Sequence, residues 1–460
     1  MLENMKRLFG QVDMTEGRPW ERILIFTVPM LIGNIAQQLY NTVDSIVVGR
    51  YVGDNALAAV GSASPIFNLL LVLFVGISMG ASIMVSQYYG SRDRENLSKT
   101  IGSSITLTAA ACLILVILGS VVIRPALELL DTPDSLIDWC TSYLMILLWG
   151  SAGLAYYNIL CGILRGLGDS LSALVYLLVA TVINIVLDIW FVAGFNMGVS
   201  GVALATVIAQ MVSAVLCFWK LHTMTDLFDM NLLYLKPDWE NVGTVIRLGL
   251  PSGLTQAIFS MAMVVVQSLT NSFGEMIIAA NVIIMRVDGF AMMPNFSFGT
   301  AMTTYAGQNV GAGQYERVKQ GAKQGTLIAA GTSAAITGLI LLFGPYLMGI
   351  FTKTRELAIL SADMMKILAV GYIAVAVTQS LSGIMRGAGD TMTPMWISLI
   401  TTVIVRVPLA YGLVYLTKTP ELPQGRYECL WVSMLCSWVL GALITFFFYR
   451  LGKWKGKALS

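Results

Sequence analysis

Long apolar stretches alternate with short polar segments along the whole chain of 460 residues. A helix needs about 20 apolar residues to cross the roughly 30 Å hydrocarbon core of a bilayer. Twelve stretches reach this length, so the pattern predicts an all-α membrane protein with twelve transmembrane helices. The predicted spans are 21–48, 55–88, 94–122, 136–163, 170–194, 199–221, 243–271, 276–308, 316–344, 357–384, 391–416 and 427–451.

The polar segments between these stretches predict the orientation of the chain. Most of the 28 lysines and arginines lie on the same side of the predicted bilayer as the N-terminus. Cytoplasmic loops of membrane proteins carry such an excess of Lys and Arg. We therefore expect a multi-pass protein of the cell's cytoplasmic (inner) membrane, with both termini in the cytoplasm.

The two halves of the chain repeat each other. The segment Gly162–Asp169 (GILRGLGD) matches Gly383–Asp390 (GIMRGAGD) at an offset of 221, and Pro29 matches Pro251 at an offset of 222. Six spans per half is an even number, so both halves enter the membrane in the same sense, as in transporters whose repeats are related by an axis along the membrane normal. The predicted organisation is an N-terminal six-helix lobe at 1–221, a cytoplasmic linker at 222–242 and a C-terminal six-helix lobe at 243–460.

Each repeated segment carries an Arg-Gly-x-Gly-Asp motif directly after the fourth span of its half. Glycine permits a tight turn between helices, and an aspartate can cap the N-terminus of the next helix. We interpret both motifs mainly as turns. A gating role shared by the two lobes is the alternative.

Composition narrows the possible chemistry. Charged residues make up 12% of the chain, against roughly 25% in soluble domains, and the net charge of +2 does not indicate nucleic-acid binding. The single histidine, His222, and the lack of a Cys-x-x-Cys pair argue against catalytic triads, metal centres and a disulfide framework. We expect no enzymatic activity and no cofactor other than a coupling ion.

Two carboxylates interrupt the apolar stretches, Asp44 in the first predicted span and Asp188 in the fifth. A carboxylate within a membrane helix costs several kcal/mol unless it is protonated, paired or facing water. Few cations lie near either residue in the sequence. The preferred explanation is that both acids gain and lose a proton, or bind a small cation, during a transport cycle. The alternatives are a helix-end interface for Asp44 and a non-titrating interhelical hydrogen bond for Asp188.

Several blocks of the chain resemble the multidrug and toxic compound extrusion (MATE) transporters of prokaryotes. The segment from Pro29 to Asp44, including QQLYNTVD, is similar to the first helix of that family. The segments 279–313 and 406–411 are similar to its eighth and eleventh helices. The resemblance covers nearly the whole chain and is specific only in combination.

The resemblance implies a cation or proton site in the N-terminal lobe, formed by Gln37, Asp44, Asn184, Asp188 and Thr206. The spacing is independently consistent with this, because residues four or seven apart lie on one face of a helix. Asn184 and Gln37 have the alternative of holding helices together through hydrogen bonds, and the Thr206 hydroxyl that of bonding to its own helix.

The C-terminal lobe differs in its intramembrane charge. NorM-like members of the family resemble one another in carrying acidic residues at the centres of spans 7 and 10. These acids are missing here, so the chain resembles the DinF-like branch more closely. By the repeat offset Asp188 corresponds to Leu409. Arg286, Asp288 and Arg406 are expected to form a buried charge cluster with a structural role, or one in gating or substrate response. The residues expected to line a substrate cavity are Tyr40, Asn41, Asn158, Gln256, Met292 and Met293.

The function that follows is an antiporter that exports amphipathic or cationic organic compounds by alternating access. Its partners are small organic substrates and the lipid bilayer, not nucleic acid, and we expect a monomer. The coupling ion is H⁺ or Na⁺, and the missing C-lobe acids favour H⁺. The alternatives are a flippase for lipid-linked precursors from the same superfamily, a channel, and an intramembrane enzyme.

Overall fold

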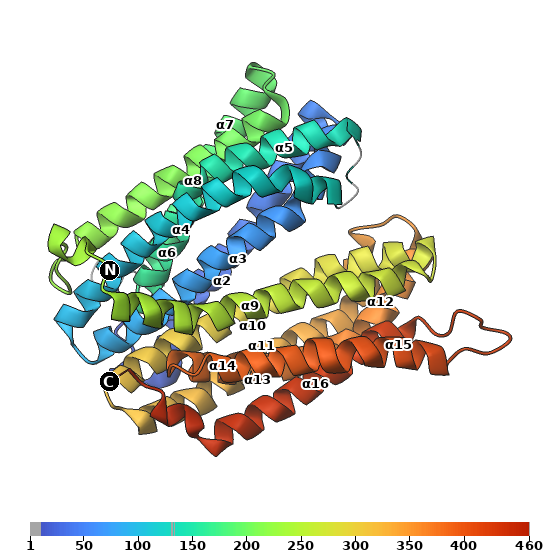
Figure 1. Ribbon diagram of the computed structural model, residues 1–460. Coiled ribbons are helices and arrows are strands. Elements are labelled where there is room, and N and C mark those ends of the chain that lie inside the picture. Colours follow the sequence, from blue (N-terminus) through green and yellow to red (C-terminus); the bar gives the residue numbers. More distant parts are fainter. Residues whose placement is uncertain (1–10, 130–131, 133, 460) are drawn as a thin grey trace, which may run out of the picture. The chain divides into compact units, whose positions relative to one another are not determined.

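The computed structural model describes residues 11–129, 132 and 134–459, without the side chains of residues 44, 45, 54, 55, 57, 58, 62, 64, 65, 69 and 232. Nearly all of this part is helical (Figure 1), and its one β-type feature is an isolated bridge between Thr419 and Leu422. The predicted all-α fold is confirmed.

Ten described helices are long and apolar enough to cross a membrane singly, and two further pairs qualify together. The first pair is α5 (Asp134–Trp149) with α6 (Ser151–Gly166), bent by 51°. The second is α12 (Arg355–Ala369) with α13 (Gly371–Gly387), bent by 43°. With each pair counted as one span, the described chain holds the twelve spans that were predicted. The sequence pattern had not indicated that the fourth and tenth spans are broken.

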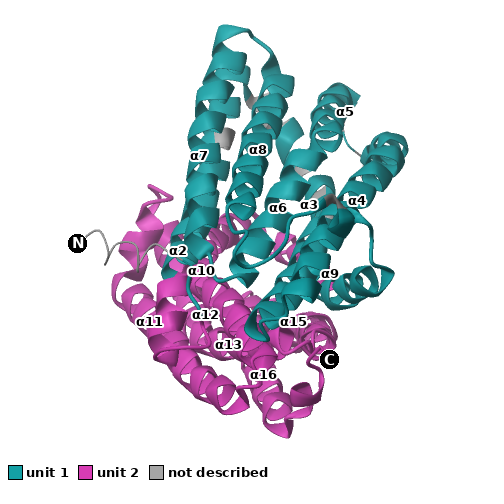
Figure 2. Ribbon diagram, turned by 90° about the vertical axis from the view of Figure 1, so that its left-hand side faces the viewer, with its two compact units in different colours: residues 1–13, 28–253 teal, residues 14–27, 254–460 magenta. Residues whose placement is uncertain are grey.

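The chain packs as two compact units (Figure 2). Unit 1 comprises Met1–Asp13 and Val28–Gly253, and unit 2 comprises Met14–Thr27 and Leu254–Ser460. The helices α2 (Pro19–Val47) and α9 (Trp239–Asn271) each begin in one unit and end in the other. The unit boundary therefore falls inside these helices, close to Pro29 and Pro251, and the segment 222–242 belongs to unit 1.

In both units a short helix occupies the centre. In unit 1, α6 packs against α3, α4 and α8, and in unit 2, α13 packs against α10, α11 and α16. The remaining elements of unit 1 are η1 (Val48–Val52), α3 (Asp54–Gly90), α4 (Arg94–Leu129), α7 (Ser170–Asp188), η2 (Ile189–Gly194), α8 (Gly198–His222) and η3 (Leu232–Leu235). Those of unit 2 are α10 (Glu275–Gly311), α11 (Tyr315–Gly349), α14 (Met392–Leu399), η4 (Ile400–Val405), α15 (Arg406–Leu416), α16 (Glu428–Leu451) and η5 (Lys453–Gly456).

The repeated glycine motifs form equivalent turns in the two units. Gly168 and Gly389 have φ angles of 91° and 98°, which L-residues with a side chain rarely adopt. Asp169 then caps α7 by accepting hydrogen bonds from the Ser172 backbone N–H (2.9 Å) and hydroxyl (2.7 Å). Asp390 accepts the same two bonds from Thr393, at 3.3 and 2.8 Å. The predicted turn-and-cap role is confirmed in both repeats.

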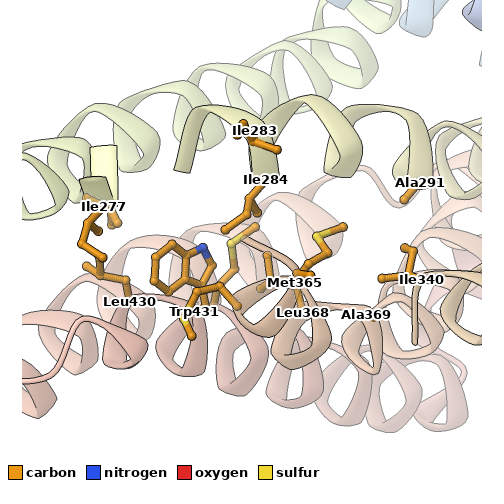
Figure 3. Packing of buried hydrophobic residues seen from close by; sticks show 14 of the residues in the cluster. Ile277, Ile283, Ile284, Ala291, Ile340, Met365, Leu368, Ala369, Leu430 and Trp431 are labelled. Atoms are coloured by element: carbon orange, nitrogen blue, oxygen red, sulfur yellow. The ribbon is translucent and has the colours of Figure 1, made fainter. Parts of the chain in front are cut away.

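A large apolar cluster fills unit 2 between α10, α11, α12 and α16. Ile284 on α10, Met365 and Leu368 on α12, and Trp431 on α16 are buried side by side within it (Figure 3). Burying such side chains stabilises a helix pair by about 1.5–3 kcal/mol each in water. Between membrane helices, where lipid surrounds the protein in place of water, close packing of side chains provides much of the stabilisation.

Central helix α13 approaches α10 so closely that only glycine fits at the contact. A Cβ atom at Gly383 would collide with the carbonyl oxygen of Gly299. We expect Gly383→Ala to destabilise the protein by about 1–3 kcal/mol, because the two backbones must move apart. The measurement is the thermal unfolding midpoint of the purified protein in detergent.

Gly331→Ala is the matched control, because no atom lies within 4 Å of a Cβ added there in the middle of α11. Alanine is the better helix former, so this midpoint is expected to stay the same or rise slightly. Equal midpoints for the two variants would contradict the packing argument.

Candidate functional site

The strongest candidate site in unit 1 is the buried end of α7. Asn184 and Asp188 lie one helical turn apart, and both side chains have 0% exposure. Immediately after Asp188 the helix changes to the wider π-helical geometry of η2. Such π-helical segments are rare and occur frequently at functional sites.

Three helices bring polar side chains together at this point. Tyr40 of α2 is buried and donates a hydrogen bond from its hydroxyl to Thr206 Oγ1 of α8 (3.3 Å). Asn184 of α7 lies against the same hydroxyl, with 3.4 Å between its amide nitrogen and Thr206 Oγ1. The structure therefore brings together Asn184, Asp188 and Thr206, three of the five residues predicted to form one site, and adds Tyr40 to them.

One orientation of the Asn184 amide satisfies both its nitrogen and its oxygen, and it points the nitrogen away from Thr206. In this orientation the nitrogen donates to Asp188 Oδ2 (3.1 Å), and the oxygen accepts from the Tyr40 hydroxyl and the Thr206 backbone N–H, both at 3.3 Å. It suits an ionised Asp188, because a carboxylate accepts hydrogen bonds and cannot donate them.

The remaining two predicted residues of this site lie on α2. Gln37 is half-buried, one turn before Tyr40, and no hydrogen bond described in the structure joins it to the other four side chains. Residue 44 is part of α2, but the side chain of Asp44 lies outside the described residues. The predicted roles of Gln37 and Asp44 stay predictions.

The C-lobe residues form a second polar region. Asp288 Oδ1 accepts a hydrogen bond from the Tyr372 hydroxyl (2.9 Å), and Asp288 and Arg406 line one cavity of about 60 Å³ together with Gln267 and other residues. Arg406 is only 6% exposed and directly follows the π-helical segment η4. Of the predicted cluster, Arg406 is thus buried and Asp288 half-buried.

Arg286 departs from that prediction, because its side chain is exposed and it does not line this cavity. It precedes Asp288 by two positions, and residues two apart on a helix do not face each other. The sequence prediction of one buried cluster of three charges is therefore wrong for Arg286.

The six predicted substrate-cavity residues have different environments. Asn41 and Gln256 are exposed, whereas Tyr40, Met292 and Met293 are buried. Asn158 is half-buried and its amide donates to the Leu154 carbonyl of its own helix (2.8 Å). Asn41 in unit 1 and Gln256 in unit 2 are thus the exposed members of the set.

The family model MatE matches this chain twice, at residues 29–190 and 251–412. The two matches have equal lengths and are displaced by 222 residues, as the internal repeat requires. The chain belongs to the MATE family. The predicted resemblance is confirmed, and so is the assignment to transporters and not to enzymes.

Individual relatives agree with this assignment over almost the full chain. The probable multidrug resistance protein YoeA of Bacillus subtilis is 29% identical over 448 residues, covering 96% of this chain and 95% of that protein. The probable multidrug resistance protein YpnP of the same organism is 28% identical, covering 97% and 98%. A solved outward-facing multidrug resistance MATE transporter of the MOP superfamily has a TM-score of 0.89 at 25% identity, covering 96% and 97%.

Membership of the MATE family makes this chain a multi-pass membrane protein of a multidrug efflux family. Tyr40, which the sequence predicted to line the substrate cavity, lies instead in the buried cluster with Thr206. The available signal was spacing, since Tyr40 lies four residues before Asp44 and shares its helix face. Tyr372, the hydrogen-bond partner of Asp288, had no such signal, because it comes from a different helix.

Proposed function

We propose that this MATE protein is an antiporter that exports amphipathic organic cations in exchange for protons, by alternating access between its two lobes. The observation that carries the proposal is the buried cluster of Tyr40, Asn184, Asp188 and Thr206. A buried ionisable group among membrane helices is expensive and marks an ion pathway by default. In the proposed orientation both termini are cytoplasmic, and the site loads from the outside.

We infer that the amide of Asn184 turns over when Asp188 gains a proton. An ionised Asp188 accepts from the Asn184 amide nitrogen, and the Asn184 oxygen then accepts from the Tyr40 hydroxyl. A protonated Asp188 donates to the Asn184 oxygen, so the amide turns and its nitrogen donates to Thr206 instead. The Tyr40 hydroxyl then donates to Thr206 Oγ1 in place of the Asn184 oxygen.

Protonation at α7 thereby changes what α2 is bonded to. Tyr40 is the α2 residue that switches partners, and α2 contains Pro29, which removes one helical hydrogen bond and permits a bend. A proton on Asp188 is in this way coupled to the packing of the first span. Such a link between an ion and a two-state helix is what alternating access requires.

Substrate transport by the purified protein in sealed vesicles tests this function. With proton and sodium gradients imposed together, we expect a fluorescent organic cation to accumulate against its own concentration gradient. Vesicles without protein serve as the control. A channel would only equilibrate the cation, and a flippase would move a labelled lipid-linked precursor across the bilayer and leave the cation outside. Either of these results would replace the proposal.

A further inference from the structure

Unit 2 contains an open groove of about 700 Å³ at one end of its helices, unrelated to the sites above. Its walls come from the first turns of α11 and the last turns of α16, together with η5, and its floor from α13. Four cationic side chains line it, Lys319 and Lys323 of α11, Arg450 of α16 and Lys455 of η5. No aspartate or glutamate is among its described lining residues.

Two of the four cations, Arg450 and Lys455, lie against aromatic side chains at the mouth of the groove. The Arg450 guanidinium lies 5.6 Å from the centre of the Phe446 ring, and the Lys455 ammonium 5.8 Å from that of Trp454. Trp454 is itself only 1% exposed, stacks on Tyr449 and donates its indole N–H to the Tyr449 carbonyl (3.0 Å). Lys319 pairs with the exposed Glu316, and exposed ion pairs of this kind contribute little to stability.

Below the cations the groove becomes apolar. Leu327 lies eight residues after Lys319, which places it about 12 Å deeper along α11. Leu327 is 63% exposed, Phe446 is 49% exposed, and Leu381 of α13 contributes to the floor. A polar, positive mouth above an apolar wall is complementary to an anionic head group carrying acyl chains.

The equivalent face of unit 1 is covered by the chain itself. At the repeat offset of 221, Lys319, Lys323 and Leu327 correspond to Ser98, Gly102 and Thr106 of α4. The segment that follows α8 crosses all three. The Ser98 hydroxyl accepts from the Asp229 backbone N–H (2.8 Å), and the Thr106 hydroxyl donates to the Leu235 carbonyl (2.7 Å).

Gly102, the middle residue of that face, leaves no room for a side chain. A Cβ atom there would collide with the carbonyl oxygen of Tyr234 in η3. In unit 2 the same position carries Lys323, an exposed cation that lines the open groove. The two repeats therefore share a surface that one covers with protein and the other leaves open and positively charged.

We propose that the groove formed by α11, α13, α16 and η5 binds an anionic glycerophospholipid of the cytoplasmic leaflet. The leaflet follows from the orientation in the proposed function, whereas binding by the purified protein does not depend on it. Basic pockets between membrane helices on the cytoplasmic side bind anionic lipid head groups. The apolar wall and the volume favour a lipid over a soluble phosphate, which would use only the mouth.

Lipid retention tests the proposal without reference to transport. Protein purified in detergent is mixed with phosphatidylglycerol or with phosphatidylcholine, and bound lipid is counted by native mass spectrometry. We expect phosphatidylglycerol to be preferred. Each cation near an anionic head group contributes roughly a fivefold gain in affinity, so Lys319→Gln combined with Lys323→Gln is expected to weaken binding more than tenfold.

Two further variants keep this test decisive. Lys319→Arg with Lys323→Arg retains the charges and is expected to retain the lipid, which separates charge loss from misfolding. Lys236→Gln with Lys457→Gln removes two cations that do not line the groove, and is expected to bind as the unaltered protein does. Equal retention of the two lipids, equal losses in both Gln pairs, or displacement of the lipid by inorganic phosphate at millimolar concentration would each overturn the proposal.

Discussion

Replacing Asp188 with asparagine is expected to abolish coupled export while leaving the protein folded. Asparagine has nearly the shape of aspartate and can still accept the 3.1 Å hydrogen bond from the Asn184 amide nitrogen. It cannot take up or release a proton, so the hydrogen bonding at residue 188 no longer changes during the cycle. The amide of Asn184 is then expected to keep one orientation. We expect the initial rate of ion-driven efflux to fall to that of cells without the protein, with a change in unfolding free energy of no more than about 1 kcal/mol.

The experiment compares efflux of a fluorescent cation from cells that contain equal amounts of each variant, together with their unfolding midpoints. Leu409→Met is the matched control, because residue 409 is the counterpart of Asp188 in the second repeat and lies on α15. A volume-conserving change there is expected to preserve export. Normal efflux by the Asp188→Asn variant would remove Asp188 from the coupling mechanism.

The parts of the fold that depend on repeated local patterns were predictable from the sequence. Span length and apolar composition suffice for the number of crossings, because the bilayer sets one minimum length for all of them. The turns at Gly168 and Gly389 were predictable for a similar reason, since a positive φ and a capping aspartate are local requirements. Neither inference needs knowledge of how the helices pack.

The features that depend on packing were not predictable. The bends between α5 and α6 and between α12 and α13, and the π-helical segments η1, η2 and η4, carry no periodic signal in hydrophobicity. A π-helical segment contains an extra residue within a turn, and apolar residues surround it on both sides. Only the structure shows that Asp188 and Arg406 each adjoin such a segment.

Only part of the candidate site was predictable from the sequence, because some of its contacts lie within one helix and others between helices. Asn184 and Asp188 share one helix face, which spacing alone indicates. Tyr40 and Thr206 meet them through contacts between α2, α7 and α8, which depend on how far each helix is rotated. For Arg286 the prediction failed in the opposite way. It is close to Asp288 in sequence, which suggested a shared environment, but residues two apart lie on different faces of a helix.

Efflux is expected to stop when the pH gradient is dissipated and to continue without sodium. In the described cluster, with the Asn184 amide nitrogen donating to Asp188, hydrogen bonds of 3.1–3.3 Å turn the oxygens of Asp188 and Asn184 towards N–H and O–H donors. A bound Na⁺ would require several of these oxygens to point at one common centre, which breaks those bonds, whereas a proton needs only one carboxylate oxygen.

Everted membrane vesicles distinguish the two ions directly. With a pH gradient and no sodium, we expect accumulation of a fluorescent organic cation at a rate within about twofold of that in sodium buffer, a difference worth less than about 0.5 kcal/mol. An ionophore that exchanges protons for potassium should reduce the rate to background, and a sodium gradient alone should not restore it. An absolute requirement for sodium at a constant pH gradient would instead make the same cluster a sodium site, in which the amide of Asn184 turns its oxygen to the metal and not to Tyr40.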